Sequence, residues 1–293
     1  MVEEPIIEIV DLTVDYGDYQ AVKGVSFTVE RGELYALLGT NGAGKTSPLE
    51  TVEGHRTPSG GTVRVFGHDP QDRETVRPRT GIMLQESGFA PDLTARETVA
   101  LIGKLSSRTD DVDRVLAVAN LTNKRSTKVA QLSGGEKRRL DFATAIFGGP
   151  DLVFLDEPTT GLDIQARDAL WDAVNRLRND GTTIVLTTHY LEEAQQRADR
   201  IGLMHDGLIR TEGTVAELTA ALPATIRFAR PDQAPPASLR SRVDEHGLLL
   251  VETRDLQRDL LTLLRWADEQ NVELAGLTAG PTSLDDVFRT LNR

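Results

Sequence analysis

The chain has 293 residues, enough for one large domain and a smaller one, and carries a formal net charge of −12. It has no cysteine, which excludes disulfides, thiolate chemistry and cysteine-based zinc sites. No apolar run approaches the ~18 residues that cross a membrane, and the acidic balance disfavours a surface for nucleic acid. We therefore expect a cytoplasmic protein that has no signal segment, binds no nucleic acid and reaches a membrane only through a partner.

The first part of the chain alternates apolar and polar residues. Residues 7–10 and 25–29 follow this pattern, which is typical of half-buried strands. We predict an antiparallel sheet over residues 2 to about 34. The apolar run at 33–38 then predicts a short buried strand.

A glycine-rich segment follows this strand and matches the P-loop pattern G-x-x-x-x-G-K-[ST]. Its glycines let the backbone wrap around phosphate oxygens, and the helix that follows directs its positive end to the same place. Lys45 is predicted to reach the β- and γ-phosphates, and the Thr46 hydroxyl to bind Mg²⁺. The residues predicted to hold the nucleotide here are Gly39, Thr40, Asn41, Gly42, Ala43, Gly44, Lys45 and Thr46.

The middle of the chain, over about 92–149, has the periodicity of helices. Near its end, the small residues Ser133, Gly134 and Gly135 precede a predicted helix over 136–146. Free N–H groups at the start of such a helix are a phosphate site, and Ser133 is also compatible with a simple helix cap. This segment is not part of a single P-loop site. Its presence suggests that a second copy of a similar chain completes the site.

Two further apolar runs end beside polar side chains. Residues 151–157 end in two carboxylates, as expected of a central parallel strand whose carboxyl end meets the ligand. Asp156 is predicted to hold Mg²⁺ and Glu157 to activate the attacking water as a general base. The run 182–186 predicts another strand that places His189 at the same edge, where its imidazole can contact the γ-phosphate.

The remaining segments complete the large domain and form a small accessory domain. Residues 164–178 carry the apolar stripe of an amphipathic helix, and Gly181 is a plausible stop. We place the domain boundary after residue 218, so that the accessory domain covers 219–293. In the accessory domain the sequence predicts strands over 224–228, 248–251 and 272–274, a helix over 256–267 and a capped helix over 283–291.

Together these motifs resemble the nucleotide-binding subunit of an ABC (ATP-binding cassette) transporter. The signature segment of that family is similar to residues 132–140, and its magnesium strand with the following loop resembles residues 152–163. Gln85 resembles the glutamine of the family's Q-loop, and Tyr16 resembles the aromatic residue that stacks on adenine. The tail is similar to the small C-terminal domain of ABC-2-type exporters, the group that contains daunorubicin-resistance-type drug pumps.

The resemblance implies an α/β P-loop NTPase fold. Its parts would be a RecA-like parallel-sheet core, an antiparallel β subdomain, a helical subdomain over about 92–149 and a small α+β C-terminal domain. The nucleotide-binding domain, 1–218, would bind ATP and Mg²⁺, with Gln85 joining Thr46 and Asp156 at the metal.

The resemblance also implies a dimer of cassettes, either a homodimer or a heterodimer, that sandwiches two ATP molecules. Ser133, Gly134 and Gly135 would then cover the γ-phosphate bound by the opposite subunit, and Asp163 would lie at the dimer seam. A separate transmembrane permease would hold the cassettes on the inner face of the cell membrane.

The predicted activity is ATP hydrolysis coupled to export of a drug, lipid or other hydrophobic compound through that permease. A soluble non-transport ABC ATPase, such as an assembly factor, is the alternative, and an importer subunit is another. The accessory domain shows no catalytic constellation. We expect it to dock a partner or stabilise the dimer, with ligand sensing as the alternative.

Overall fold

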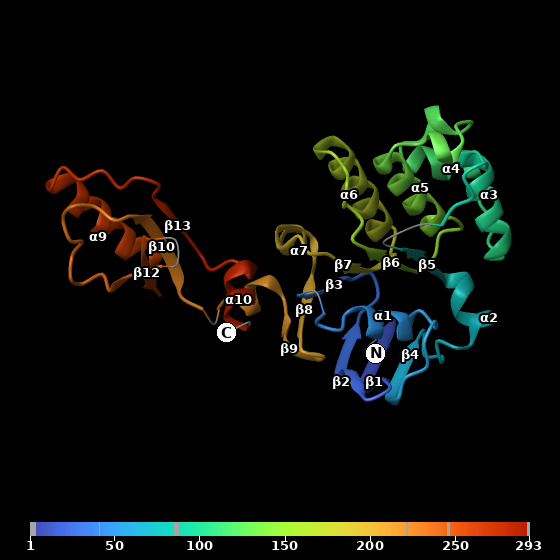
Figure 1. Ribbon diagram of the computed structural model, residues 1–293, viewed down its shortest axis with the longest axis horizontal. Coiled ribbons are helices and arrows are strands. Elements are labelled where there is room, and N and C mark those ends of the chain that lie inside the picture. Colours follow the sequence, from blue (N-terminus) through green and yellow to red (C-terminus); the bar gives the residue numbers. More distant parts are fainter. Residues whose placement is uncertain (1–3, 41, 85–87, 221, 245–246, 292–293) are drawn as a thin grey trace. The chain divides into compact units, whose positions relative to one another are not determined.

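The computed structural model divides the chain into two compact units, residues 1–214 and 215–293 (Figure 1). The boundary predicted after residue 218 falls inside helix α8 (Val215–Ala220), which packs against helix α10 (Leu284–Leu291) of the second unit. The residues that the structure describes are 4–40, 42–84, 88–220, 222–244 and 247–291.

A mixed sheet with the strand order β5-β6-β7-β3-β8-β9 forms the centre of the first unit. The pairs from β5 to β8 are parallel, and β9 joins β8 in the antiparallel sense. Each of the apolar runs predicted at 33–38, 151–157 and 182–186 forms a strand of this sheet, because a parallel strand covered on both faces must be apolar throughout. The strands are β3 (Leu34–Gly39), β5 (Thr80–Met83), β6 (Leu152–Asp156), β7 (Thr183–Thr187), β8 (Arg200–His205) and β9 (Leu208–Gly213).

The predicted antiparallel sheet is confirmed and has the order β2-β1-β4. Its strands are β1 (Ile7–Tyr16), β2 (Tyr19–Val29) and β4 (Gly60–Val65). Helix α1 (Thr46–Val52), which follows the P-loop, packs against all three strands. One apolar cluster joins Ile9 of β1, Leu37 of β3 and Phe154 of β6, so the two sheets share a core.

Helices cover the other side of the central sheet in Figure 1, and three of them form the helical subdomain predicted over 92–149. These three are α3 (Ala95–Leu105), α4 (Val112–Val118) and α5 (Gly134–Ile146), joined by the 3-10 turns η2 (Thr122–Lys124) and η3 (Val129–Gln131). Helix α5 packs against β5 as well as against α3 and α4, so it connects the subdomain to the core. The other helical segments of this unit are α2 (Arg73–Val76), η1 (Arg77–Arg79), α6 (Ile164–Asn179) and α7 (Leu191–Arg197).

The second unit is a four-stranded antiparallel sheet with the order β11-β12-β10-β13 and its own apolar core. Helix α9 (Leu256–Glu269) contributes the buried Leu263 to this core, beside Ile226 and Phe228 of β10. The predicted capped helix is also present, since the Ser283 hydroxyl accepts a hydrogen bond from the backbone N–H of Asp286 at 3.3 Å. The strands are β10 (Ala224–Ala229), β11 (Ser241–Val243), β12 (Leu248–Thr253) and β13 (Thr278–Gly280).

The strand predicted over 272–274 is wrong. The backbone N–H of Val272 donates to the carbonyl oxygen of Ala267 at 2.8 Å, and Asn271 has a φ of 51°, so this segment closes the end of α9. Leu274 packs on the core without a strand, and the edge strand β13 forms a few residues later. An apolar-polar-apolar triplet is too short to separate these two outcomes from sequence.

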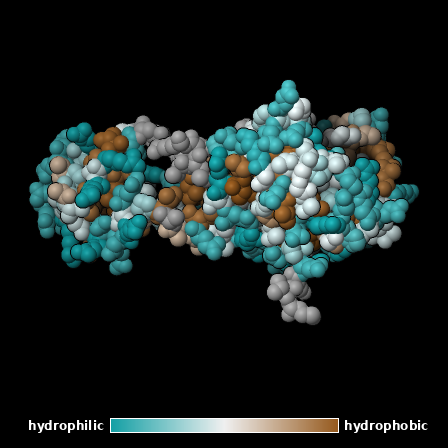
Figure 2. Space-filling view, turned by 90° about the horizontal axis from the view of Figure 1, so that it is seen from below, coloured by the Kyte–Doolittle hydropathy of each residue, from teal (hydrophilic) through white to brown (hydrophobic). Residues whose placement is uncertain are grey.

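Among the helices that the structure describes, none is both long and apolar enough to cross a membrane. The face seen in Figure 2 is mostly hydrophilic, with smaller hydrophobic patches on each unit. Two exposed leucines lie on helices of different units, Leu105 on α3 and Leu264 on α9.

Gly81 of β5 lies against the main chain of α5, and a Cβ added there would overlap the carbonyl oxygen of Ala145. Gly81→Ala must therefore displace α5, and we expect it to lower the free energy of unfolding by about 1–3 kcal/mol in urea denaturation. Gly280→Ala is the control, because its Cβ would meet no atom within 4 Å. Equal stability of the Gly81→Ala variant and the parent would contradict this packing.

Candidate functional site

The strand order places β6, β7 and β3 side by side, and all three run parallel. Their carboxyl ends therefore share one edge of the sheet, which is where open α/β sheets bind ligands. The P-loop follows β3, Asp156 ends β6, and His189 follows β7. The topology alone thus brings these predicted site residues, from distant parts of the sequence, to one place.

The P-loop turns tightly between β3 and α1. Gly42 and Gly44 have φ values of 82° and 94°, and a Cβ on Gly44 would lie 2.6 Å from the carbonyl oxygen of Ala21. Both positions therefore require glycine. The Lys45 amine lies back over the loop, with Nζ 2.6 Å from the carbonyl oxygen of Gly39 and 3.1 Å from that of Thr40. Asn41 lies outside the described residues.

Two opposing effects act on the Lys45 amine. Burial lowers the pKa of Lys45, while the carboxylates of Glu157 and Asp156 favour its charged form. The amine is thus within electrostatic reach of both carboxylates predicted to act in the site. A partly desolvated cation at this position is a strong counter-charge for a phosphate.

The carboxylates at the end of β6 are held by the neighbouring strand and loops. Asp156 Oδ1 accepts a hydrogen bond from the Thr187 hydroxyl, and the Glu157 N–H donates to the Thr187 carbonyl oxygen at 2.9 Å. Glu157 Oε1 lies 3.1 Å from Nδ1 of His189, and Oε2 accepts from the Thr160 hydroxyl at 3.3 Å. The predicted base and the predicted γ-phosphate contact therefore touch each other.

Oxygen donors suited to Mg²⁺ lie at this edge. Mg²⁺ prefers oxygen ligands and usually keeps several waters, being held by one or two protein groups together with substrate phosphates. The Thr46 hydroxyl and the Asp156 carboxylate match that donor set. Among the described residues, no group of three or more His, Cys, Asp or Glu side chains could hold a metal. Gln85, the third predicted ligand, lies outside them.

Tyr16 lies beside the start of α1. Its hydroxyl is 3.1 Å from Oγ of Ser47, and its side chain is 45% exposed. The Arg56 guanidinium lies 4.3 Å from the centre of the Tyr16 ring and is held by Glu50 at 2.8 Å. The contact of Arg56 could not be predicted from the sequence, because a loop arginine about ten residues beyond the P-loop has no pattern that points to an aromatic ring.

The signature segment, residues 132–140, begins α5. The Ser133 hydroxyl accepts from the Glu136 N–H at 3.2 Å, and Glu136 accepts from the Ser133 N–H at 2.8 Å, so Ser133 is a helix cap in this structure. Asp163 likewise caps α6 through the Ala166 N–H at 2.8 Å. In the part of the chain that the structure describes, no hydrogen bond or ion pair joins residues 133–135 to the P-loop.

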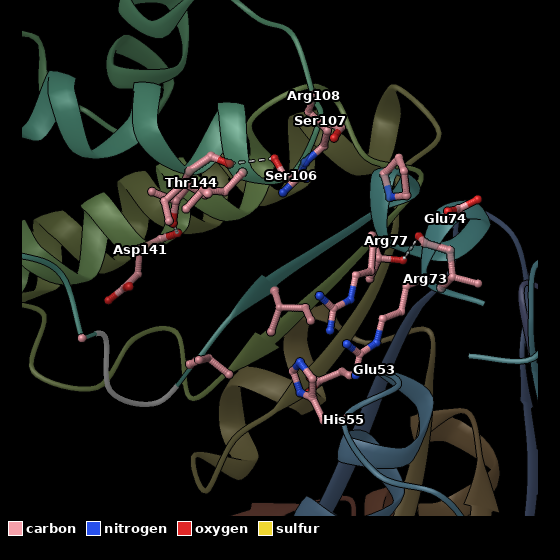
Figure 3. Close-up of a pocket in the computed structure, with 18 of the residues that line it drawn as sticks. Glu53, His55, Arg73, Glu74, Arg77, Ser106, Ser107, Arg108, Asp141 and Thr144 are labelled. Atoms are coloured by element: carbon pink, nitrogen blue, oxygen red, sulfur yellow. Dashed lines mark hydrogen bonds and ion pairs between the residues drawn. The ribbon is translucent and has the colours of Figure 1, made fainter. Parts of the chain in front are cut away.

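A groove of about 790 Å³ lies between the core and the helical subdomain. Figure 3 shows Asp141 and Thr144 of α5 on one side of it and His55 and Arg77 on the other. The groove could not be predicted from the sequence, because its walls come from segments far apart in the chain. Its lining combines charged groups with the apolar side chains of Ile82, Leu84, Phe89, Ile102 and Leu105.

Comparison with known proteins identifies the family. A family model described as ABC transporter matches residues 22–160, and one described as ABC transporter domain-containing protein-like, C-terminal domain, matches 224–283. The daunorubicin/doxorubicin resistance ATP-binding protein DrrA of Streptomyces peucetius is 34% identical, over 97% of this chain and 92% of that protein. The chain belongs to the ABC transporter family. The Nod factor export ATP-binding protein I of Burkholderia lata is 37% identical to this cassette, over 94% of it and 93% of the relative.

Solved structures agree with this assignment. The ATP-binding subunit of an ABC transporter superposes with a TM-score of 0.69 at 27% identity, covering 74% of this chain and 92% of that one. A dimeric ATP-binding cassette in a post-hydrolysis state, bound to ADP and Pi, gives a TM-score of 0.65 at 25% identity, covering 71% and 98%. The predicted cassette fold, the ATPase class and the resemblance to drug-exporter ATPases are confirmed.

Lys45→Ala should weaken ATP binding by at least about tenfold, because it removes the counter-charge that the P-loop presents to phosphate. Titration with a fluorescent ATP analogue measures the dissociation constant. Lys104→Ala, at an exposed position of α3, is the matched control and should bind like the parent. The same affinity in both variants would contradict a phosphate role for Lys45.

Proposed function

We propose that this cassette is the ATP-binding and hydrolysing subunit of an exporter, and that it drives a drug, lipid or other hydrophobic compound through a separate membrane subunit. The observation that carries the hydrolytic part is the contact between Glu157 and His189 at the sheet edge that also holds the P-loop. The export part is supported by relatives named for drug resistance and Nod factor export, which match nearly the whole chain, including the second unit.

The described side chains divide the chemistry among them. Glu157 accepts the proton of the attacking water, and the His189 imidazole, 3.1 Å away, orients that carboxylate and faces the γ-phosphate. Lys45 balances the charge of the β- and γ-phosphates. Thr46 and Asp156 would hold Mg²⁺ together with the phosphates, and the ion would neutralise further charge on the transferred group.

We further propose that two copies of the chain form the working unit. In each site the P-loop of one copy would face residues 133–135 of the other, and Asp163 would lie near the seam. Two observations support this arrangement: among the described residues, 133–135 make no hydrogen bond to the P-loop of their own copy, and a related cassette is dimeric with ADP and Pi bound. An isologous contact of this kind closes with two-fold symmetry and gives two equivalent sites.

The groove beside the site is our candidate surface for the membrane subunit. Its apolar side chains, including the exposed Leu105, would receive a cytoplasmic segment of that subunit and hold the cassette on the inner face of the membrane. Helix α5 lines the groove with Asp141 and begins with the signature segment. Closure of the dimer would therefore move α5 as a rigid element, and α5 would transmit this movement to the membrane subunit.

Glu157→Gln should bind ATP with the parent's affinity but hydrolyse it about 10²–10⁴ times more slowly, since the amide cannot accept the water proton. We expect the variant to accumulate an ATP-bound dimer in size-exclusion chromatography. Phosphate release measures turnover, and Glu192→Gln, at an exposed position of α7, is the control. Parental turnover in Glu157→Gln would overturn the general-base assignment.

The export proposal predicts a membrane partner. A tagged Glu157→Gln chain, purified from source-cell membranes in mild detergent, should carry a multi-span membrane protein in stoichiometric yield, as identified by mass spectrometry. Adding Leu105→Glu should abolish that yield, because it places a charge in the groove, whereas Leu264→Glu on α9 should not. Recovery of soluble partners alone would favour a non-transport ATPase and contradict the export proposal.

A further inference from the structure

Arg138 connects three segments of the first unit. It lies in the second turn of α5, and only 6% of its surface is exposed. Its guanidinium donates hydrogen bonds to the main-chain carbonyl oxygens of Leu84, Asp156 and Glu157, the last at 2.7 Å. The fork of a guanidinium can hold several acceptors at fixed angles, which the single ammonium of a lysine cannot do.

Two of these carbonyl oxygens belong to the catalytic end of β6. Glu157 has a φ of 46°, a backbone conformation that is uncommon for residues other than glycine. Its N–H is held by the Thr187 carbonyl, and its carbonyl oxygen accepts both from Arg138 and from the Thr160 N–H at 3.2 Å. Arg138 therefore fixes, from the side of α5, the peptide that determines where the Glu157 side chain points.

The third carbonyl oxygen, that of Leu84, belongs to the residue directly before the segment that contains Gln85. The same guanidinium thus joins the signature helix, the end of β6 and the chain that leaves β5. Any rotation of α5 relative to the sheet would stretch these bonds together.

Packing alone does not require a charge at this position. Burial lowers the pKa of Arg138, while the carboxylates of Asp141, Asp156 and Glu157 favour its charged form. An apolar side chain of similar length would fill the space without the cost of desolvating a cation. The feature specific to arginine is the set of directed bonds to the catalytic main chain.

We propose that Arg138 is a positioning residue: it holds the main chain of Glu157 in the conformation that hydrolysis requires and so links the signature helix to the catalytic carboxylate of the same copy. This inference rests on the proposed role of Glu157 as general base. It couples α5 to Glu157 within one copy, in addition to the contact that we expect between the signature segment of one copy and the P-loop of the other.

Arg138→Met should lower kcat for ATP hydrolysis by about 10–100-fold, because small displacements of a catalytic group have effects of this size, while the dissociation constant for ATP stays within about threefold. Arg138→Lys should give an intermediate kcat. Arg176→Met is the control, because Arg176 is an exposed arginine of α6 whose guanidinium donates to the carbonyl oxygen of Asp172 at 3.2 Å, away from the proposed site. The control should keep kcat within about twofold of the parent.

A double variant separates positioning from a general structural role. If Arg138 acts through Glu157, then Arg138→Met should not slow turnover further in the Glu157→Gln background, whereas independent effects would multiply. A parental kcat in Arg138→Met, or multiplied losses in the double variant, would overturn the inference. If Arg138→Met does not fold, the same two measurements, kcat alone and kcat in the Glu157→Gln background, are made with Arg138→Lys. Rapid turnover in Glu157→Gln alone would instead overturn the proposed function.

Discussion

The parallel register of β6, β7 and β3 is the constraint on which the rest of the site depends. Thr187 of β7 lies opposite Asp156 of β6 on one side and Leu37 of β3 on the other. This register brings the P-loop, the carboxylates and His189 to one edge. Because side chains alternate between the faces of a sheet, a slip of one residue would turn Asp156 away from the P-loop. The continuous apolar character of the three strands buries them on both faces.

Helix α5 extends this constraint into the helical subdomain. Residues 133–135 of the signature segment lie at its start, Arg138 lies in its second turn, and Asp141 then lines the groove. The close approach of Gly81 holds the far end of the helix against β5. A single rigid helix therefore connects the surface proposed to face a second copy, the main chain of Glu157 and the surface proposed to face a membrane subunit.

Much of this arrangement could be predicted from sequence because it depends on local pattern. The P-loop, the apolar strand ending in Asp156 and the capped helices are encoded by residues near one another. The groove and the contacts of Arg138 could not be predicted, since they join main-chain atoms from segments that meet only after folding. The strand predicted over 272–274 was wrong because the N–H of Val272, the first residue of this triplet, donates to a carbonyl oxygen at the end of α9. The roles of the predicted site residues, Gln85 and Tyr16 included, stay predictions.

The claim that two copies build each site is tested most directly by mixing two inactive variants. Lys45→Ala removes the phosphate counter-charge, and Ser133→Arg blocks the signature segment. Each alone should be inactive, but a mixed dimer contains one intact P-loop opposite one intact signature segment. We expect ATPase activity to return on mixing, up to about a quarter of the parental rate if partners pair at random and the two sites act independently. No recovery on mixing, or full activity of Ser133→Arg alone, would contradict it.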